Sequence, residues 1–427
     1  MPRPTFRTKP RATDADEAPG VAARRAALRL LDAVLRRGDP LDQAAPPVLR
    51  AIERGDDRAL ALAIAQEALR WMADLDALID GATRQILPED AKARSVLRIM
   101  LAQTLRLGLP GHAVVATGLP LLSGGPRRLA HGVFTAVTAS GAALPAAPTL
   151  PPAVEARWQS AWPGRTEAIA AGLAEPPPLD LTLRDPAQTA QWAERLGGHS
   201  LGPGHVRLAR AGAVDALDGF REGAWWVQDL AASVPARLLG AGHGRRALDL
   251  CAAPGGKTLQ LAAAGWRVTA LDKSARRTER LAQNLRRSRL DAEVVVADAL
   301  QWQPDAPYDA ILLDAPCSAT GTCRRHPDVL HRQANLPELT SLQSVMLERA
   351  AGWLAPGGML VYAVCSLEPE EGEAQAAAFT GLAPVPVTDA ELPAGLVATG
   401  GHFRSDPGML AQHGGIDGFF ATRWTRR

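Results

Sequence analysis

Apolar residues recur every three to four positions through residues 21–141, a spacing that places them on one face of a helix. The pattern is clearest at 27–35, 60–79 and 96–105, and turns rich in glycine and proline separate these stretches. The sequence therefore predicts an all-α domain over residues 21–141. A helical bundle with no binding role is the alternative interpretation of the same pattern.

Three segments lack this helical period. Residues 1–20 are rich in proline, arginine, threonine and aspartate and predict a flexible tail. Residues 142–152 are rich in alanine and proline and predict a semi-extended linker. Residues 153–235 combine short helical stretches with strand-like runs at 179–183 and 205–209, which predicts a small α/β subdomain.

From residue 236 to residue 427 short apolar runs alternate with helical stretches. This alternation predicts a Rossmann-like α/β domain with a doubly wound, mostly parallel sheet. In such sheets the ligand site lies beyond the carboxyl ends of the strands, where most of the predicted strands here end in a carboxylate or a thiol. The runs are Arg246–Leu250, Val268–Asp272, Glu293–Asp298, Ala310–Asp314 and Met359–Val364.

Composition agrees with a multidomain globular protein. The chain has 427 residues, and its 47% hydrophobic and 22% charged residues exclude wholesale disorder. No apolar run is long enough for a membrane span, and the N-terminus lacks the apolar core of a signal peptide. Four cysteines without a CxxC pair do not form a disulfide framework, so we expect a reducing, cytoplasmic setting without membrane association.

Charge is distributed unevenly along the chain. Residues 1–150 have an excess of basic residues, and residues 151–427 have a slight excess of acidic ones. This asymmetry indicates an acidic partner such as nucleic acid for the N-terminal part, although a solvated surface gives a similar pattern. The chain has only four lysines, and one of them, Lys257, lies in the glycine-rich segment after the first predicted strand of the Rossmann-like domain.

That segment, Asp249–Thr258, reads DLCAAPGGKT and joins a strand to a helix. Its small residues allow the backbone to approach a ligand, and the following helix offers unpaired N–H groups. Residues 256–258 match the end of a P-loop, but Cys251 occupies the position of the required first glycine. The dinucleotide fingerprint GxGxxG is absent as well.

Asp272 and Asp298 end the second and third predicted strands. The first is placed to accept hydrogen bonds from ribose hydroxyls, and the second can meet an adenine amino group. A helix N-cap is the alternative interpretation of each. Together with the glycine-rich segment they describe a nucleoside pocket without a phosphate clamp. S-adenosylmethionine (SAM) fits such a pocket because it contains adenosine and a carboxylate but no phosphate.

Two cysteines, Cys317 and Cys365, follow the fourth and fifth predicted strands. Neighbouring strands lie roughly 4.8 Å apart, so the two thiols can face one pocket, whereas an isolated cysteine in such a place is usually inert packing. A zinc site built from all four cysteines is disfavoured because no pair has finger spacing, and we expect no metal.

Paired thiols beside a nucleoside pocket indicate cytosine chemistry. A thiolate added to C6 of cytosine makes C5 nucleophilic enough to attack the SAM methyl group. Asp314, held beside N3 and the exocyclic amine, would stabilise the added proton. A base then removes the C5 proton and the thiol is expelled. The spacing alone does not choose between Cys317 and Cys365 as the nucleophile.

Three motifs resemble the Nol/Nop/Sun (NSUN) family of RNA 5-methylcytosine methyltransferases: CAAPGGKT at 251–258, DAPCSATGTCRRHPD at 314–328 and YAVCSLEPEE at 362–371. The turn at 226–229 and the DGFF stretch at 417–420 are also similar to family motifs. The helical region resembles the NusB-like RNA-binding domain, a layout typical of the Sun (Fmu) subfamily. The resemblance implies a SAM-dependent RNA methyltransferase that acts on 16S rRNA, and we expect a monomer.

By position, the resemblance implies Cys365 as the nucleophile and Cys317 as the residue that assists product release, with Asp314 beside them. The Pro-Cys motif of DNA cytosine methyltransferases would instead select Cys317 as the nucleophile. The implied SAM site consists of Cys251, Ala252, Ala253, Pro254, Gly255, Gly256, Lys257, Asp272, Asp298 and Asp314.

The chain departs from the family pattern at several positions. Val364 replaces the usual threonine before the nucleophile and removes a hydroxyl near the thiol. Ala319 replaces a frequent glycine, and Asp185 stands where asparagine is common. Residues 118–128 match the NusB-like pattern poorly.

RNA contacts are harder to assign. Arg324, Arg325 and His326 could meet phosphates beside a flipped base, whereas the arginines at 276–289 are interpreted as a solvated helix face. Two other functions stay open. One is a tRNA cytosine-C5 methyltransferase of the same superfamily, and the other is a non-catalytic RNA-binding assembly factor that kept the fold.

Overall fold

The computed structural model describes residues 19–209 and 212–427, so the tail predicted over residues 1–20 lies almost wholly outside the described residues. The chain divides into two compact units, residues 1–149 and residues 150–427. This division falls inside the segment for which the sequence predicts a linker. The other predicted domain bounds stay predictions.

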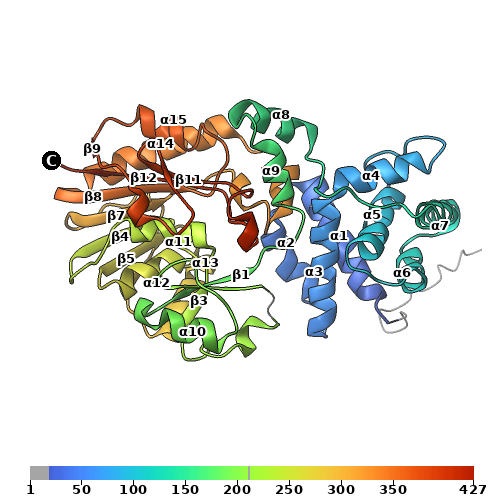
Figure 1. Cartoon of the computed structure of the whole chain (residues 1–427), viewed down its shortest axis with the longest axis horizontal. Helices are drawn as coiled ribbons and strands as arrows, with labels where there is room; N and C mark the ends of the chain where they lie inside the picture. The colour runs from blue at the N-terminus through green and yellow to red at the C-terminus, as the bar shows by residue number, and fades with distance from the viewer. Residues whose placement is uncertain (1–18, 210–211) are drawn as a thin grey trace, which may run out of the picture. The chain divides into compact units, whose positions relative to one another are not determined.

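The first unit is built from helices, in agreement with its hydrophobic periodicity (Figure 1). They are α1 (Val21–Arg37), α2 (Leu41–Leu49), α3 (Gly55–Arg70), α4 (Met72–Gly81), α5 (Lys92–Leu105), α6 (Gly111–Gly118) and α7 (Gly124–Ala139). Helix α5 is central, because its residues 93–103 are all buried and it contacts α1, α3, α4, α6 and α7. Buried charge is paired: Glu67 accepts hydrogen bonds from Arg70 and Arg106 at 3.0 and 2.9 Å. None of the described helices is long and apolar enough to cross a membrane.

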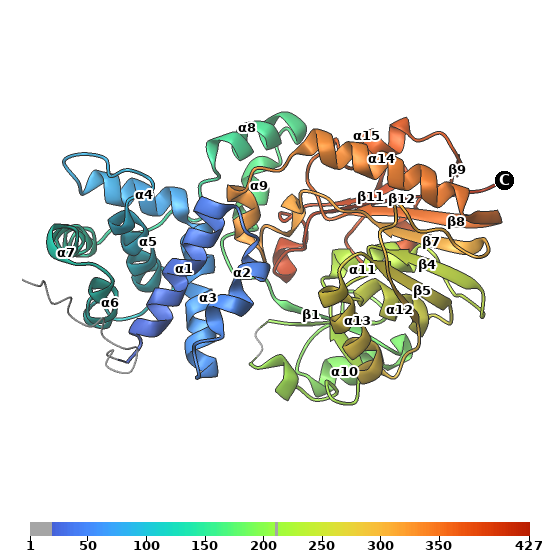
Figure 2. The same ribbon diagram turned by 180° about the vertical axis from the view of Figure 1, so that it is seen from behind.

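The second unit centres on a mixed sheet with the strand order β10-β11-β12-β8-β7-β4-β5-β6 (Figures 1 and 2). The parallel strands are β4 (Arg246–Leu250), β5 (Arg267–Asp272), β6 (Glu293–Val296), β7 (Tyr308–Asp314) and β8 (Leu354–Val364). The others are β9 (Ala383–Pro384), β10 (Ala398–Thr399), β11 (His402–Ser405) and β12 (Phe419–Thr425), which pairs antiparallel with β8. The sequence did not predict β9–β12.

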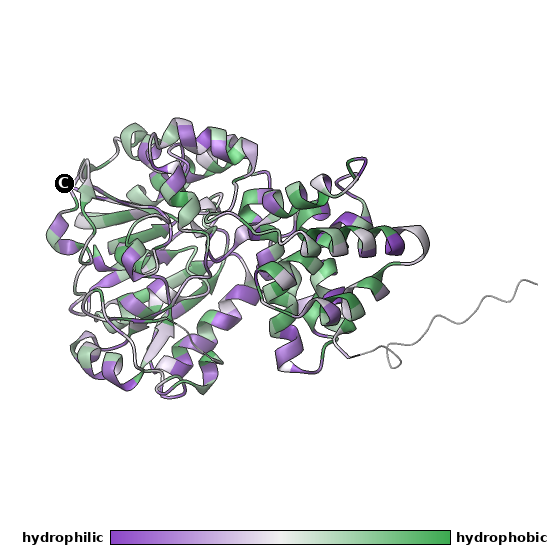
Figure 3. Cartoon of the chain, turned by 45° about the vertical axis from the view of Figure 1, so that its right-hand side comes forward, coloured by the Kyte–Doolittle hydropathy of each residue, from purple (hydrophilic) through white to green (hydrophobic). Residues whose placement is uncertain are grey.

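Helices cover both faces of this sheet (Figure 1). One face packs against α11 (Leu230–Arg237), α12 (Gly256–Ala263) and α13 (Ala275–Ser288), and the other against α14 (Leu336–Gly352) and α15 (Glu373–Ala378). Alternate side chains of β8 point to opposite faces of the sheet. Val361 and Ala363 pack on the side of α11, and Leu360 and Tyr362 pack on the side of α14. Figure 3 shows hydrophobic residues along the central strands. Because β4 to β8 run parallel, their carboxyl ends lie at the same edge of the sheet.

A smaller antiparallel sheet precedes the main one in the chain. Its central strand β1 (Leu179–Leu183) lies between β2 (His205–Leu208) and β3 (Trp225–Val227), and α10 (Thr189–Arg195) packs on it. Helices α8 (Pro152–Ala161) and α9 (Thr166–Ala171) come before it. The segment 226–229 was expected as a turn, and this is wrong in part: Trp226 and Val227 end β3. Asp229 then caps α11 by accepting a hydrogen bond from the Ala231 N–H at 2.8 Å.

Candidate active site

The two thiols expected at one pocket meet at the carboxyl edge of the main sheet. Cys317 follows β7 and Cys365 follows β8, and these strands are hydrogen-bonded neighbours. The two Sγ atoms are 3.6 Å apart, and both residues are partly exposed. The adjacency of the strands, which the alternating pattern predicts, therefore brings the sulfurs into contact.

The proton of Cys317 is held tightly. Its hydrogen bond with Cys365, its burial and the negative charge of Glu371 all raise the pKa of the Cys317 thiol well above its usual value. Cys317 is therefore a thiol, not a thiolate, at neutral pH.

Asp314 ends β7 and lies beside the cofactor loop, defined here as residues 251–255 between β4 and α12. Lys257 Nζ donates to Asp314 Oδ2 at 2.7 Å, and it lies 5.0 Å from the centre of the Phe419 ring. Burial alone would lower the pKa of Lys257, but the charge and hydrogen bond of Asp314 outweigh it and raise that pKa. The site thus contains a fixed ammonium–carboxylate pair.

The cofactor loop is shaped by two left-handed residues, Cys251 at φ 60° and Gly255 at φ 109°. Glycine adopts this conformation without steric cost, and a Cβ at Gly255 would come 3.0 Å from Leu281 Cγ. The Ala252 N–H donates to the Leu271 carbonyl at 3.1 Å, which ties the loop to the end of β5. Burial and the charges of Asp314 and other nearby carboxylates raise the pKa of Cys251 to about 12.

The two strand-end carboxylates differ in exposure. Asp272 is buried and accepts hydrogen bonds from Ala253 N at 3.2 Å and Ser274 N at 2.9 Å. Asp298 is exposed, lies two residues beyond the end of β6, and accepts from Leu300 N at 2.9 Å. Each accepts a hydrogen bond from a backbone N–H two residues ahead, as a helix N-cap does, and each keeps lone pairs for further donors. Their contacts with a nucleoside stay predictions.

Asp249, at the start of the glycine-rich segment, acts inside the fold. It is fully buried and accepts a 2.5 Å hydrogen bond from the Thr258 hydroxyl, which links β4 to the first turn of α12. Burial raises the pKa of Asp249 to about 7.

Arg324 and Arg325, which the sequence suggested as phosphate contacts, both lie close to carboxylates of the protein itself. Arg324 is 1% exposed and lies 3.6 Å from Asp417. Arg325 donates to Asp229 at 2.6 Å and to Asp417 at 3.0 Å. Both guanidinium groups therefore anchor the loop after β7 inside the protein, and His326 alone of the three is exposed.

Two arginines of α13 bind backbone carbonyls, and one of these two, Arg277, is also exposed. Arg287 donates to the carbonyls of Phe220 and Trp225 at 2.9 and 3.0 Å, and Arg277 donates to the Ala253 carbonyl of the cofactor loop. The exposed members of the helix region are Arg276, Arg277, Arg280, Arg286 and Arg289.

The loop after β8 is held from several sides. Trp162, the residue after α8, donates to the Leu367 carbonyl at 2.8 Å, and Arg157 of α8 binds Glu368 through two nitrogens at 3.1 and 3.0 Å. Arg404 of β11 donates to the Ser366 carbonyl at 2.6 Å. Gly321 packs against Gly418 so closely that a Cβ there would overlap the Gly418 carbonyl oxygen.

Two contacts in this site were missed by sequence reasoning. One is the pairing of Lys257 with Asp314, for which the scarcity of lysine was a signal. The other is Glu371, a fully buried carboxylate that accepts hydrogen bonds from Ser318 and Ser366. The serine that follows each of the two cysteines could have indicated a shared acceptor. Glu371 itself stands in an acidic run, which is typical of a solvated surface.

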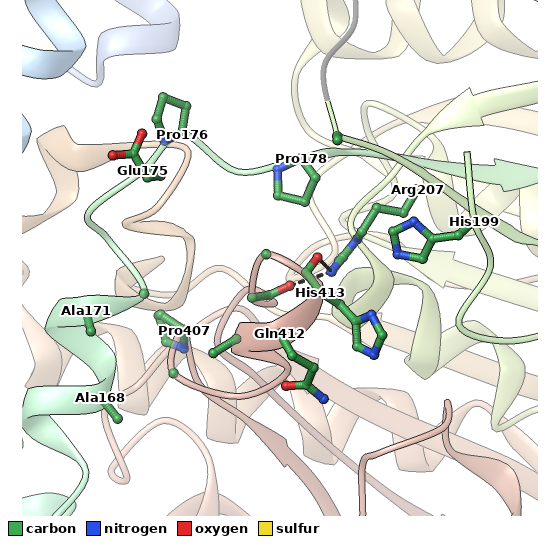
Figure 4. A pocket seen from close by; sticks show the side chains of 16 residues that line it. Ala168, Ala171, Glu175, Pro176, Pro178, His199, Arg207, Pro407, Gln412 and His413 are labelled. Atoms are coloured by element: carbon green, nitrogen blue, oxygen red, sulfur yellow. Dashed lines mark hydrogen bonds between the residues drawn. The ribbon is translucent and has the colours of Figure 1, made fainter. Parts of the chain in front are cut away.

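A separate cavity of about 580 Å³ lies between α9, the small sheet and residues 407–415 (Figure 4). Arg207 lines it and donates to the carbonyls of His413 and Gly415 at 2.9 and 2.7 Å. Neither reactive-site thiol lines this cavity. Across residues 19–209 and 212–427, no group of three or more His, Cys, Asp or Glu side chains is arranged to hold a metal ion.

Known proteins resemble both units. The family model described as 16S rRNA methyltransferase RsmB/F matches residues 236–424, and the NusB family model matches residues 21–121. Ribosomal RNA small subunit methyltransferase B of Klebsiella pneumoniae is 35% identical over 94% of this chain and 97% of its own length. The protein of the same name from Pseudomonas putida is 37% identical over 93% of this chain and 97% of its own length.

Solved structures share the fold. The crystal structure of PH0851 has a TM-score of 0.71 at 22% identity and covers 95% of this chain and 99% of its own. A methyltransferase homolog protein from Pyrococcus horikoshii has a TM-score of 0.53 at 25% identity, over 64% of this chain and 94% of its own.

The strand order, the helices on both faces and these neighbours define a Rossmann-like methyltransferase domain preceded by a NusB-like helical domain, which confirms the predicted fold class. The chain belongs to the RsmB/F family of 16S rRNA methyltransferases, which confirms the resemblance found in its motifs. The NusB match ends at residue 121, within the segment 118–128 that departs from the NusB-like pattern.

Proposed function

We propose that this protein transfers a methyl group from SAM to C5 of a cytosine in 16S rRNA through a covalent adduct between Cys365 and C6. The observation that carries the proposal is the 3.6 Å contact between the sulfurs of Cys317 and Cys365. The names of the relatives, ribosomal RNA small subunit methyltransferase B, support the choice of RNA.

The residues around the cofactor loop fit SAM better than a phosphate-bearing cofactor. Asp249, Asp272 and Asp314 lie close enough to Cys251 to act on its thiol electrostatically. Asp314 is paired with Lys257 and Asp249 is bonded inside the fold, so Asp272 is the carboxylate of the three that is left for hydroxyl donors, and the described residues around the loop include no set of unpaired cations for a phosphate. Residues 251–257, with Asp272, Asp298 and Asp314, would hold SAM, which supplies the methyl group when bound.

The protein's own groups divide the reaction between them. The Cys365 thiolate forms a bond to C6, and the ring electrons move toward N3, where Asp314, fixed by Lys257, stabilises the added proton. The proton added at N3 comes from solvent water. After C5 is methylated, its proton passes to water acting as the base, the bond between C6 and sulfur breaks, and the C5–C6 double bond forms again as N3 returns its proton to solvent. Cys317 is in contact with the departing sulfur and holds the proton that this sulfur needs.

Substituting each cysteine in turn distinguishes the roles proposed for the two thiols. We expect Cys365→Ala to abolish methyl transfer from labelled SAM to 16S rRNA, because the proposed adduct then lacks its nucleophile. We expect Cys317→Ala to accumulate a denaturant-resistant RNA–protein band, because release of the adduct is slowed. Cys323→Ala is the control, since that cysteine is buried in another apolar cluster.

A Cys365→Ala protein that methylates at the wild-type rate would contradict the nucleophile assignment, and the absence of a band with Cys317→Ala would contradict the release role. The same assay with tRNA in place of 16S rRNA tests the alternative substrate. Calorimetric titration with SAM tests the alternative of a non-catalytic factor, for which no binding is expected.

A further inference from the structure

Each reactive thiol is followed in the chain by a serine, and both serines bind one carboxylate. Glu371 Oε2 accepts hydrogen bonds from the hydroxyls of Ser318 and Ser366, both at 2.5 Å. Glu371 Oε1 accepts from the Ser318 backbone N–H at 2.9 Å. One side chain thus joins the loop after β7 to the loop after β8, immediately behind the two sulfurs.

The surroundings of Glu371 fix its position. The residue is fully buried, and Gln343 of α14 donates from Nε2 to Glu371 Oε1 at 3.0 Å and to the Pro316 carbonyl at 2.9 Å. The hydroxyl of Tyr362 donates to the Glu371 carbonyl at 2.6 Å. Burying a carboxylate is unfavourable unless donors surround it, so these contacts hold the group in a defined place.

The donors to the Glu371 carboxylate are two hydroxyls, an amide and a backbone N–H, which are all neutral. Its negative charge is therefore felt by nearby groups. That charge is one of the causes that raise the pKa of Cys317, together with the bond to Cys365 and burial.

We propose that Glu371 is a positioning residue that sets the separation of the Cys317 and Cys365 sulfurs by binding Ser318 and Ser366, the residues that follow them. This inference rests on the proposed function, because the separation of the thiols matters only if both take part in one reaction. It assigns Glu371 no contact with RNA or SAM. Its effect is expected on turnover and on thiol reactivity.

The test compares Glu371→Gln with Glu370→Gln, which makes the same chemical change at an exposed neighbour. Methylation kinetics are measured with 16S rRNA, and the alkylation of each cysteine by iodoacetamide is followed against pH by mass spectrometry. We expect Glu371→Gln to lower kcat by about tenfold to a hundredfold, with KM for RNA changed less than about twofold, because misplaced reacting groups slow turnover. Glu370→Gln should match the wild type.

Thiol reactivity gives a readout that does not depend on RNA. In Glu371→Gln the alkylation profile of Cys317 should move to lower pH, because a negative charge beside it is gone. The profile of Cys251 should stay unchanged, since its nearby charges are other carboxylates. These profiles keep their meaning even if Cys365 proves not to be the nucleophile.

The double variant Ser318→Ala, Ser366→Ala separates position from charge. It removes both hydroxyl bonds but keeps the carboxylate, so kcat should fall while the Cys317 profile stays near that of the wild type. It also provides the kinetic test if Glu371→Gln does not fold. Wild-type kcat and an unshifted Cys317 profile in a folded Glu371→Gln, or wild-type kcat in the double variant, would overturn the inference. Neither result would affect the Cys365→Ala test of the proposed function.

Discussion

The cofactor loop and the two thiol-bearing loops lie at the same sheet edge but are held in different ways. The cofactor loop is shaped by its backbone, through left-handed conformations at Cys251 and Gly255. The loops after β7 and β8 are held by side chains from distant parts of the chain, including Glu371, Gln343 and Arg404. The first arrangement combines local backbone conformation with bonds to the end of β5 and to α13, and the second depends on hydrogen bonds between side chains of separate segments.

This difference predicts different consequences of substitution. A backbone-shaped loop resists side-chain changes unless they demand a forbidden φ, and then stability and cofactor affinity change together. A loop held by side-chain bonds can be displaced by removing one donor or acceptor, with the largest effect on turnover. Lys257 links the two regions, because it lies in the first turn of α12, directly after the cofactor loop, and binds Asp314 at the end of β7.

Lys257→Met should therefore have the largest effect. The side chain of Lys257 is 11% exposed, and its loss leaves the Asp314 carboxylate without its ammonium partner. Breaking such a pair costs about 3 kcal/mol of stability. Because Asp314 is then no longer held in place, we also expect kcat/KM to fall by about a hundredfold. Methylation kinetics measure this. Lys273→Met, at an exposed lysine, is the control and should keep wild-type activity. Equal activities of the two variants would contradict a shared role for the Lys257–Asp314 pair.

The sequence predicts the cofactor region better than the thiol region for the same physical reason. The glycines and small residues at 251–256 are themselves the sequence pattern of a tight loop, so the loop can be predicted from neighbouring residues alone. Glu371 is 53 residues from Ser318, and no local pattern shows that they meet. The two cysteines were found because strand adjacency follows from the alternation of strands and helices, but the buried role of Arg324 depends on a contact with Asp417 that the sequence does not show.

The predicted strands show the same limit. The central strands were predicted from continuous apolar runs, but β8 begins at Leu354 rather than Met359. Its first residues include Pro356, Gly357 and Gly358, which are typical of a turn, and the pairing with β7 shifts register near this end. Strand β12 was missed because its pairing with β8 is long-range and antiparallel.

Gly255→Ala should have an intermediate effect and tests the backbone side of the comparison. At φ 109° an alanine is strained by about 1–2 kcal/mol, and its Cβ would press on Leu281 at 3.0 Å. We expect a melting temperature lowered by a few degrees and weaker SAM binding by calorimetry. Gly352→Ala, in α14 with nothing within 4 Å of the added Cβ, is the matched control and should not lower stability. An unchanged melting temperature for Gly255→Ala would show that the loop conformation is not required.

Asp298→Asn should have the smallest effect on stability and sharpens the distinction between a structural and a ligand-binding carboxylate. Asp298 is exposed, and asparagine can still accept the Leu300 N–H bond, so the free energy of unfolding should change by less than about 0.5 kcal/mol. SAM affinity should fall by up to about tenfold if the carboxylate receives the adenine amino group. Asp272→Asn is the comparison variant: Asp272 is buried and bonds two backbone N–H groups, so its substitution should lower both stability and affinity. Wild-type SAM affinity in Asp298→Asn would show that Asp298 does not bind SAM and that its role is the local hydrogen bond with Leu300 N.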